Sequence, residues 1–440
     1  MSFDGNKDAN RVIVIGAGPM GLAAAYYAAK AGRAVTVFEA DDRVGGMAAH
    51  FDFDGLSIER FYHFCCLSDV DTLALMDELG MNGAMKWVRT TMGFYAGGAL
   101  YDWGDPIALL KFPGLNFIEK LRYGMQAFTS TKRSDWRNLD RISAEDWFIA
   151  WCGRSVYERL WKPLLALKFY DHAGEISAAW MWQRIKRLGN SRKSLFEERL
   201  GYIEGGSERL MIALADAIRK TGGEIRLKTP VRRILFRDGA ALGVELASGE
   251  RALGPHVVST APIPHVVDML AEAPADFTAP YARIKNIGVV CVMAKLKKSV
   301  SPHFWVNISD ARVEIPGLVE FSNLRPLPNT IVYVPFYMPQ GNPKFSRPDA
   351  DFVSDALAAI RLVNPGIGEK DVIATHVGRL RYAQPVCEVG FSAMIPKAQT
   401  AIRGLQIADT CFYYPEDRGV SESVKFARGL AAAISSAEAA

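Results

Sequence analysis

The chain has little excess charge of either sign and few of the residue patterns that hold metals. Lys and Arg number 52 against 48 Asp and Glu, a formal net charge of +4 in 440 residues. This mild excess does not indicate a nucleic-acid partner, and no zinc-finger, helix-turn-helix or RNA-binding signature accompanies it. The seven histidines are dispersed, and the six cysteines form no CxxC or zinc-ligand spacing. We therefore predict no metal site and expect reduced, mostly buried thiols.

Long apolar runs are also scarce. The opening MSFDGNKDAN is polar and lacks the basic-then-apolar order of a secretory signal. The apolar stretch after it is interrupted by glycines, Pro19 and Lys30, which fits a glycine-rich turn better than a membrane span. No other run approaches the length needed to cross a bilayer, so the expected location is the cytoplasm.

Residues 11–39 carry the clearest local pattern, which reads as strand, glycine-rich turn, helix and second strand. The turn has the spacing Gly16-x-Gly18-x-x-Gly21. The first glycine allows a tight turn, the second lets backbone amides approach a pyrophosphate, and the third lets the helix pack close to the sheet. The second strand ends on Glu39, whose position suits hydrogen bonds to ribose hydroxyls. This pattern predicts a dinucleotide site.

Elements of the same kind recur in the middle and at the end of the chain. Ser207 is expected to cap a helix that stops at a glycine pair, and a strand at 405–407 precedes a long helix from about Val420. A helical block dense in Trp, Phe, Lys and Arg separates them. We predict two interleaved domains. The dinucleotide-binding one comprises 9–80, 201–269 and 376–440, and the substrate domain comprises 81–200 and 270–375 with a helical part at about 106–199.

The segment Arg43-Val44-Gly45-Gly46, the later GGSERLMIALADAI and TPVRRI, and Ala408-Asp409 together carry a family resemblance. On these residues the chain resembles the superfamily of FAD-dependent amine oxidases, protoporphyrinogen oxidases and phytoene desaturases, closest in pattern to protoporphyrinogen oxidase-like proteins. The resemblance covers both ends and the middle, and it is weakest between about 81 and 200. It implies an α/β fold in which a Rossmann-like FAD-binding domain is interleaved with a mixed-sheet substrate domain and a helical subdomain.

The same resemblance implies which residues hold FAD. They are Gly16, Gly18, Pro19, Met20, Gly21, Glu39, Arg43, Gly45, Gly46, Met47, Val231, Asp409 and Val420. Arg43 would bind the diphosphate, with an ion pair to a neighbouring aspartate as the competing interpretation. Val231 matches a residue whose backbone meets adenine, and Asp409 matches an acid near the phosphate and ribityl chain. The chain has Ala408 where the family usually has glycine. The helix from Val420 would aim its positive end at the flavin.

The implied activity is hydride transfer from an apolar or aromatic small molecule to flavin N5, in an enzyme of the amine oxidase, protoporphyrinogen oxidase or desaturase type. Tyr62 and His63 lie where relatives bring backbone beside the flavin ring, with core packing as the alternative. Arg381, with Arg379, could bind an anionic substrate group or form a salt bridge. Tyr413-Tyr414 would face either the flavin or the core.

Two other functions remain open. Flavin-dependent UDP-sugar mutases also place a histidine after the RxGG element, although they have Gly-Arg where this chain has Ala408-Asp409. Small-GTPase dissociation inhibitors share the fold without flavin. The tryptophan-rich helical block reads as buried packing, or as an apolar channel or membrane-surface patch because basic residues flank Leu109–Phe117. A small-molecule substrate is expected, but the sequence leaves its identity, the electron acceptor and the oligomeric state open.

Overall fold

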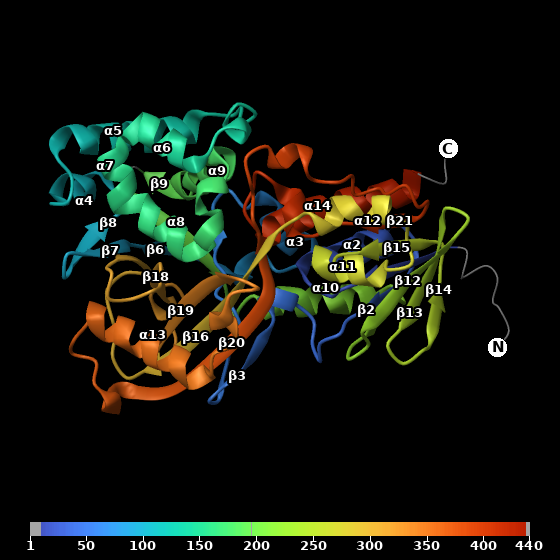
Figure 1. The fold of residues 1–440 in the computed structure, drawn as a ribbon. Helices are drawn as coiled ribbons and strands as arrows, with labels where there is room; N and C mark the ends of the chain where they lie inside the picture. The colour runs from blue at the N-terminus through green and yellow to red at the C-terminus, as the bar shows by residue number, and fades with distance from the viewer. Residues whose placement is uncertain (1–9, 195, 437–440) are drawn as a thin grey trace.

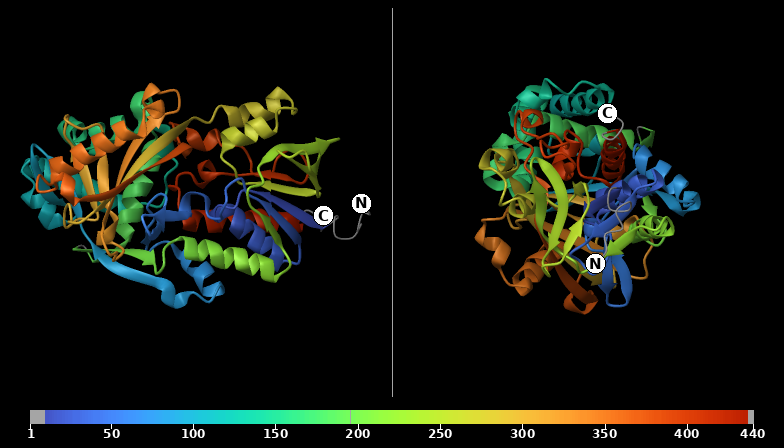
Figure 2. Two further views of the ribbon diagram at one scale, coloured as in Figure 1. Left: turned by 90° about the horizontal axis from the view of Figure 1, so that it is seen from below. Right: turned by 90° about the vertical axis from the view of Figure 1, so that its right-hand side faces the viewer.

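The computed structural model describes residues 10–194 and 196–436, which form two lobes side by side along the long axis of the molecule (Figures 1 and 2). The first lobe is built on a five-stranded sheet in which every pairing is parallel. Its strands, in spatial order, are β11 (Glu224–Arg226), β2 (Ala34–Phe38), β1 (Arg11–Ile15), β15 (His256–Ser259) and β21 (Leu405–Ile407). Strands from the start, middle and end of the chain therefore lie in one sheet.

Both faces of this sheet are covered, which explains why its strands are nearly continuous apolar runs. Val12 and Val14 pack with one set of helices, whereas Ile13 and Ile15 face the opposite side. The helices are α2 (Pro19–Lys30), α3 (Val70–Glu78), α10 (Glu208–Lys220) and α14 (Val420–Ser436). The other face packs against a three-stranded meander of β12 (Val231–Arg237), β13 (Ala240–Leu246) and β14 (Arg251–Leu253), with α11 (Ile263–Met269) and α12 (Ala275–Ala282) nearby.

The second lobe is built on a mixed seven-stranded sheet. Its spatial order is β20 (Val372–Pro385), β16 (Asn286–Leu296), β19 (Thr330–Pro339), β18 (Gly317–Glu320), β17 (Trp305–Ser309), β7 (Met92–Ala96) and β8 (Ala99–Trp103). Only the β7–β17 pair in this order is parallel. Helix α13 (Asp349–Val363) packs on one face through the ring of Phe352. The opposite face is left to line the space between the lobes.

A group of helices stands above this sheet in the view of Figure 1. It comprises α4 (Pro106–Lys111), α5 (Phe117–Lys132), α6 (Ala144–Cys152), α7 (Arg154–Val156), α8 (Lys162–Phe169) and α9 (Ala178–Asn190). Two small sheets join the lobes. One pairs β3 (His50–Phe53) with β4 (Leu56–Glu59), and the other contains β5 (Cys65–Cys66), β6 (Met85–Thr90), β9 (Arg192–Ser194) and β10 (Glu197–Ile203).

The predicted α/β class, with a Rossmann-like sheet interleaved with a mixed sheet and a helical part, is confirmed. The exact domain boundaries stay a prediction. All six cysteines are free thiols, and all but Cys65 are buried. Within the described ranges, no helix combines the length and apolar character that crossing a bilayer requires.

Candidate active site

A cavity of about 1880 Å³ runs between the lobes. It begins at the carboxyl ends of β1 and β2, where ligands of open parallel sheets bind. From there it passes the seven-stranded sheet and reaches helices α8, α9 and α5. Pockets for a single small ligand measure about 300–1,000 Å³. The cavity therefore has room for an elongated cofactor and a second molecule.

The glycine turn at one end of the cavity is shaped to receive a ligand. Gly18 directly precedes helix α2, and a Cβ placed on it would meet nothing within 4 Å. At Gly21, by contrast, a Cβ would lie 1.9 Å from the Gly16 carbonyl oxygen. Gly16 itself has φ +98°, which only glycine adopts readily. Gly18 thus leaves open space for a phosphate at the helix N-terminus, while Gly21 is required for packing.

Glu39 follows strand β2 and lies at the edge of the cavity. One of its carboxylate oxygens accepts a hydrogen bond from the Ala17 amide at 2.6 Å, and the other accepts one from the Asp41 amide at 2.9 Å. The carboxylate is therefore fixed beside the glycine turn. This is the position in which an acid can accept hydrogen bonds from ribose hydroxyls.

Asp409 and the start of helix α14 form another wall. Asp409 is buried, and its carboxylate accepts hydrogen bonds from the amides of Ile263 and Cys411 at 2.9 and 2.8 Å. Burial raises the pKa of this carboxyl group. Gly419, directly before α14, and Val420 and Ser423 in its first turn line the cavity. The positive end of a 17-residue helix therefore faces the cavity. Together with the open space at Gly18, this arrangement fits an elongated, anionic dinucleotide such as a flavin dinucleotide.

The structure brings most of the predicted residues to this one cavity. Those that line it are Gly16, Gly18, Pro19, Met20, Gly21, Glu39, Gly46, Met47, Tyr62, His63, Val231, Asp409 and Val420. Of the tyrosine pair left open by the sequence, Tyr413 also lines it and its hydroxyl pairs with Ser423 at 2.8 Å. Tyr414 is instead held in the core by Ser177 at 2.7 Å.

Three predicted residues do not line the cavity. The Arg43 guanidinium donates to the Asp42 carboxylate at 2.9 Å, which is the ion pair expected as the competing interpretation. It also donates to the His50 carbonyl at 2.7 Å. Gly45 instead ties the loop to the glycine turn, because its amide donates to the Ala17 carbonyl at 2.8 Å. Arg381 is exposed and stacks over Phe345, with 5.7 Å from the guanidinium carbon to the ring centre. The diphosphate contact of Arg43 and the substrate contact of Arg381 stay predictions, since neither residue lines the cavity in this structure.

Tyr62 and His63 form the wall where the two lobes meet. The Tyr62 ring makes edge contacts to Trp305 and Tyr333, each with 5.7 Å between ring centres. His63 is held by a 2.6 Å hydrogen bond between its Nδ1 and the Phe61 carbonyl. Burial lowers the pKa of His63, so its neutral form is favoured. Both side chains are thus oriented by neighbours that leave them facing the cavity.

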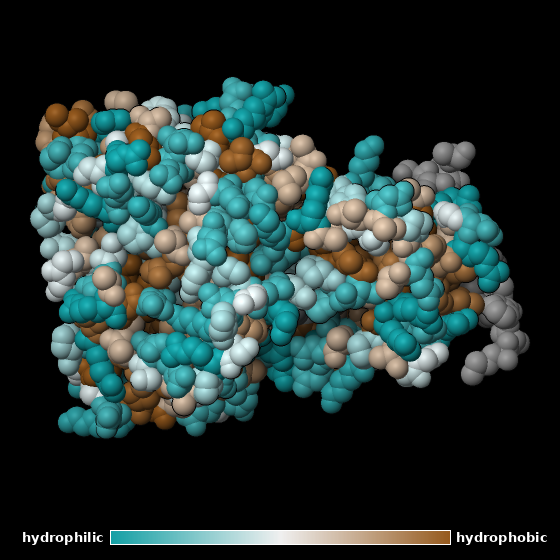
Figure 3. Space-filling view, in the orientation of Figure 1, coloured by the Kyte–Doolittle hydropathy of each residue, from teal (hydrophilic) through white to brown (hydrophobic). Residues whose placement is uncertain are grey.

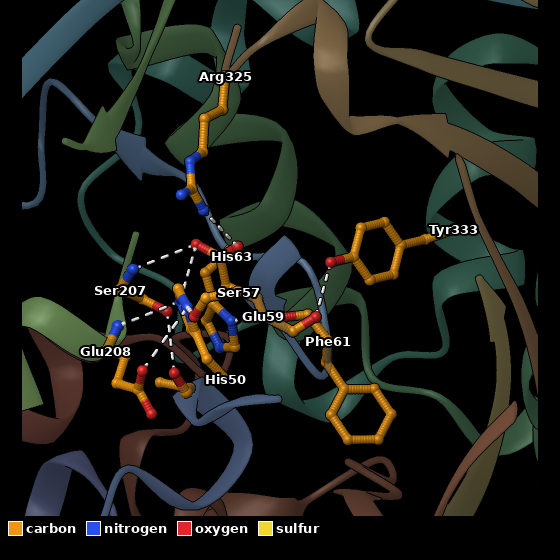
Figure 4. Close-up of polar contacts among 10 residues, drawn as sticks. His50, Ser57, Glu59, Phe61, His63, Ser207, Glu208, Arg325 and Tyr333 are labelled. Atoms are coloured by element: carbon orange, nitrogen blue, oxygen red, sulfur yellow. Dashed lines mark hydrogen bonds and ion pairs between the residues drawn. The ribbon is translucent and has the colours of Figure 1, made fainter. Parts of the chain in front are cut away.

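A buried polar network anchors the strand that leads to these residues (Figure 4). Glu59 is 2% exposed and its carboxylate meets His50 at 3.4 Å and Arg325 at 3.1 Å. Burial alone would raise the pKa of Glu59, but the hydrogen bond and charge of His50, with the charge of Arg325, lower it to about 2. Ser207 belongs to this network: its amide donates to Glu59 at 3.1 Å and its hydroxyl donates to Ala48 at 2.9 Å. Ser207 is the N-cap residue of α10, as predicted, but its side chain makes no capping hydrogen bond because its hydroxyl is used here.

Beyond Tyr62 the cavity widens into an aromatic chamber around Lys168. Its side-chain nitrogen lies 5.0 Å from the ring centre of Tyr337, 5.1 Å from that of Trp180 and 5.6 Å from that of Phe169. Burial, together with the charges of Arg184 and Arg418, lowers the pKa of Lys168 well below its usual value. The carboxylate of Asp417 lies among these basic residues: it pairs with Arg184, and its charge opposes the lowering of the Lys168 pKa.

The sequence offered an apolar channel in the helical block as one alternative, but it did not identify Lys168 or the charged residues around it. Lys168 and Arg184 lie in the helical block, and nothing local distinguishes them from other basic residues on helices. Asp417 and Arg418 carried a usable signal, because they stand just before the helix whose N-terminus was expected to face the cofactor. Thr260 was also missed; its hydroxyl donates to the Ile15 carbonyl at 2.9 Å and braces the glycine turn.

Comparison with known proteins agrees with this geometry. The family described as flavin containing amine oxidoreductase matches residues 21–383. A probable zeta-carotene desaturase from Synechococcus elongatus is 27% identical over 295 residues. The aligned region spans 60% of this chain and only 60% of that relative.

Solved structures share the fold over nearly the whole chain. A putative protoporphyrinogen oxidase from Exiguobacterium sp. 255-15 superposes with a TM-score of 0.74 at 20% identity, covering 97% of this chain and 98% of the other. A reduced UDP-galactopyranose mutase superposes with a TM-score of 0.75 at 15% identity, covering 98% of this chain and 96% of the other. At this level of identity the superpositions show the fold alone. The family match over residues 21–383 goes further: this chain belongs to the flavin-containing amine oxidoreductase family.

Proposed function

We propose that the protein is an FAD-dependent oxidoreductase that oxidises an apolar small molecule lacking a positive charge. One observation carries this proposal: a single cavity joins the glycine turn and the α14 N-terminus to the aromatic chamber around Lys168. One end has the features of a dinucleotide site, and the other has room for a substrate. When bound, FAD supplies the hydride acceptor for the oxidation.

The chain's own residues divide the remaining tasks. Gly18 and the N-terminus of α2 would hold the diphosphate, and Glu39 would accept hydrogen bonds from the adenosine ribose. Asp409 and the first turn of α14 would hold the flavin half of the cofactor. Tyr62 and Trp305 provide flat apolar walls against which a substrate can pack. Such walls exclude water, which protects a hydride transfer from side reactions.

Oxidation of a saturated bond releases a proton as well as a hydride, and we assign Lys168 as the proton acceptor. Its lowered pKa favours the neutral amine, whose nitrogen has a free lone pair. Its nitrogen stands among three aromatic rings that line the same chamber or pack beside it. The charges of Arg184 and Arg418 also act on Tyr62, so Lys168 and Tyr62 share one environment.

The charge of the chamber narrows the substrate class. Two arginines, Arg184 and Arg418, act on Lys168 against the carboxylate of Asp417, and a protonated amine bound beside the neutral Lys168 would meet this excess positive charge. This disfavours the oxidation of cationic amines. It favours dehydrogenation of a carbon–carbon bond in an uncharged substrate, the reaction type named for the desaturase relative.

The same cations favour a second candidate function. A sugar nucleotide carries a diphosphate, which Arg184 and Arg418 could bind. A UDP-galactopyranose mutase shares the fold. This reading does not explain the largely apolar and aromatic lining contributed by Trp305, Tyr337 and Trp180.

Anaerobic flavin reduction discriminates the candidates. Mixing the holoprotein with an uncharged isoprenoid hydrocarbon in detergent is expected to bleach the oxidised flavin band, whereas mixing it with putrescine should leave the band unchanged. The Lys168→Met variant should bind FAD normally but reduce at least tenfold more slowly, and the pH dependence of the step should change. Lys162→Met, on the exposed side of the same helix, is the matched control. Turnover of UDP-galactopyranose only after prior flavin reduction would replace the proposal with the mutase function.

A further inference from the structure

Helices α4 and α5 present an apolar face to solvent. On α5, Phe117 is 71% exposed and Ile118 is 68% exposed. The apolar face comprises Ile107, Leu110, Phe117, Ile118, Leu121, Met125 and Phe128, each of which is more than half exposed. In the space-filling view, hydrophobic surface gathers at the upper left, where α5 lies (Figure 3). These side chains come from two neighbouring helices and form one surface.

Helix α5 buries polar residues and exposes apolar ones, the opposite of an ordinary surface helix. Its buried positions are occupied by Gln126 and Ser130, while its large apolar side chains point outward. A surface helix normally buries its apolar stripe and exposes its polar residues. The stability of the fold therefore does not account for the apolar residues of α5, which indicates that they contact something outside the chain.

The face is large for a protein surrounded by water. Taking roughly 190 Å² for each fully exposed side chain, the exposed fractions give on the order of 800 Å² of apolar surface. The largest apolar patch on a typical soluble monomer covers about 300–600 Å². A patch above this range marks a protein or membrane contact.

Basic side chains stand on the same two helices and just beyond them. They are Lys111, Lys120, Arg122, Lys132, Arg133 and Arg137, against Asp105, Glu119 and Asp135. Basic residues beside outward apolar ones suit an anionic lipid surface, because the apolar groups enter the acyl boundary while the cations meet phosphate headgroups. A second copy of the chain fits less well, since a two-fold contact would place these cations against their own equivalents.

The cavity reaches the surface at this face. Leu109 of α4, and Gly124, Ala127 and Phe128 of α5, line the cavity that also holds Tyr62. Phe128 is both 55% exposed and part of the cavity wall. A molecule that leaves an apolar phase beside Phe128 could therefore enter the cavity without crossing bulk water.

We propose that the apolar face docks on an anionic lipid bilayer and that the opening beside Phe128 admits an apolar substrate from it. The docking proposal depends only on the exposed apolar and basic residues of this face. The delivery of substrate rests on the proposed oxidation. The occupant is the membrane, held by shallow insertion of α4 and α5, because the described residues include no helix able to span it.

Flotation of purified holoprotein with vesicles of phosphatidylcholine and phosphatidylglycerol tests the docking. The variant Phe117→Gln, Ile118→Gln, Leu121→Gln changes only side chains that point away from the cavity. Because three inserted apolar groups are lost, its partition into vesicles should fall more than tenfold. The double variant Ile212→Gln, Leu242→Gln removes exposed apolar groups elsewhere and should float like the wild type.

Wild-type protein that stays with the soluble fraction, or a triple variant that floats unchanged, would overturn the proposal. So would a wild-type dimer that the triple variant converts to monomer, since a second copy would then cover the face. Hydrogen exchange of the wild type gives an independent check: vesicles should slow exchange in α4 and α5, and unchanged exchange there contradicts docking. None of these readouts needs turnover, so a failed oxidation assay leaves the docking result interpretable.

Discussion

Replacing Gly18 with alanine separates the two roles of the glycine turn. Gly18 has φ −72° and ψ 177°, a backbone conformation that alanine adopts without strain. The added methyl group would meet nothing within 4 Å in the protein, so the fold can accept it. It would instead occupy the space at the N-terminus of α2, where the account places the cofactor diphosphate. The substitution should therefore weaken FAD binding and spare the apoprotein.

The expected size follows from the volume of one methyl group. Forcing an extra methylene-sized group into a filled site costs about 1–3 kcal/mol. With tenfold in Kd corresponding to about 1.4 kcal/mol, the Kd for FAD should rise roughly 5- to 150-fold. The stability of the apoprotein should change by less than about 1 kcal/mol, the usual range for such a substitution at a compatible site.

The assay is titration of apoprotein with FAD, followed by quenching of flavin fluorescence, alongside thermal melting of the apoprotein. Gly83→Ala is the matched control: Gly83 is exposed, lies outside the cavity, and its added Cβ would also meet nothing within 4 Å. Unchanged FAD affinity in Gly18→Ala would refute the placement of the diphosphate. A large drop in apoprotein stability would show that Gly18 serves packing instead.

Three further predictions concern stability. Gly21→Ala should lower apoprotein stability by at least about 2 kcal/mol in urea unfolding, because its Cβ would lie 1.9 Å from the Gly16 oxygen. Glu59→Gln should destabilise the protein by roughly 3 kcal/mol at pH 7, since His50 and Arg325 lower the pKa of Glu59 to about 2. The difference in unfolding free energy between variant and wild type should shrink as pH falls below about 4.5, and a pH-independent difference would contradict this. Glu422→Gln should have the opposite effect, because burial raises the pKa of Glu422 to about 7. In the same unfolding assay, the variant should become more stable than the wild type as pH rises from about 4.5 to 7, by roughly 3 kcal/mol at pH 8.5.

The parts of the site that the sequence predicts well are those whose geometry is local. The spacing Gly16-x-Gly18-x-x-Gly21 between a buried strand and a helix leaves few backbone arrangements, and the structure places all three at the cavity. The same is true of Val420, whose helix begins where its sequence pattern does. Turn chemistry and hydrophobic periodicity act over a few residues, so they can be read directly.

The features that the sequence could not place depend on contacts between distant segments. Arg381 lies near a register shift of β20 against β16, between Gln384 and Leu380, and such an irregularity re-aims side chains in a way that alternation cannot predict. Ser207 had the right type and position for a cap, but its hydroxyl is used by Ala48, 159 residues away. Lys168 differs from other helical lysines only through its neighbours Trp180 and Tyr337, which come from another helix and from a strand.

The content of bound nucleotide tests the central claim most directly. Protein purified without added cofactor, or reconstituted with FAD, should release about one FAD per chain on denaturation, and its visible spectrum before denaturation should be that of oxidised flavin. Protein that stays colourless after incubation with FAD, or that releases a nicotinamide dinucleotide instead, would contradict the account.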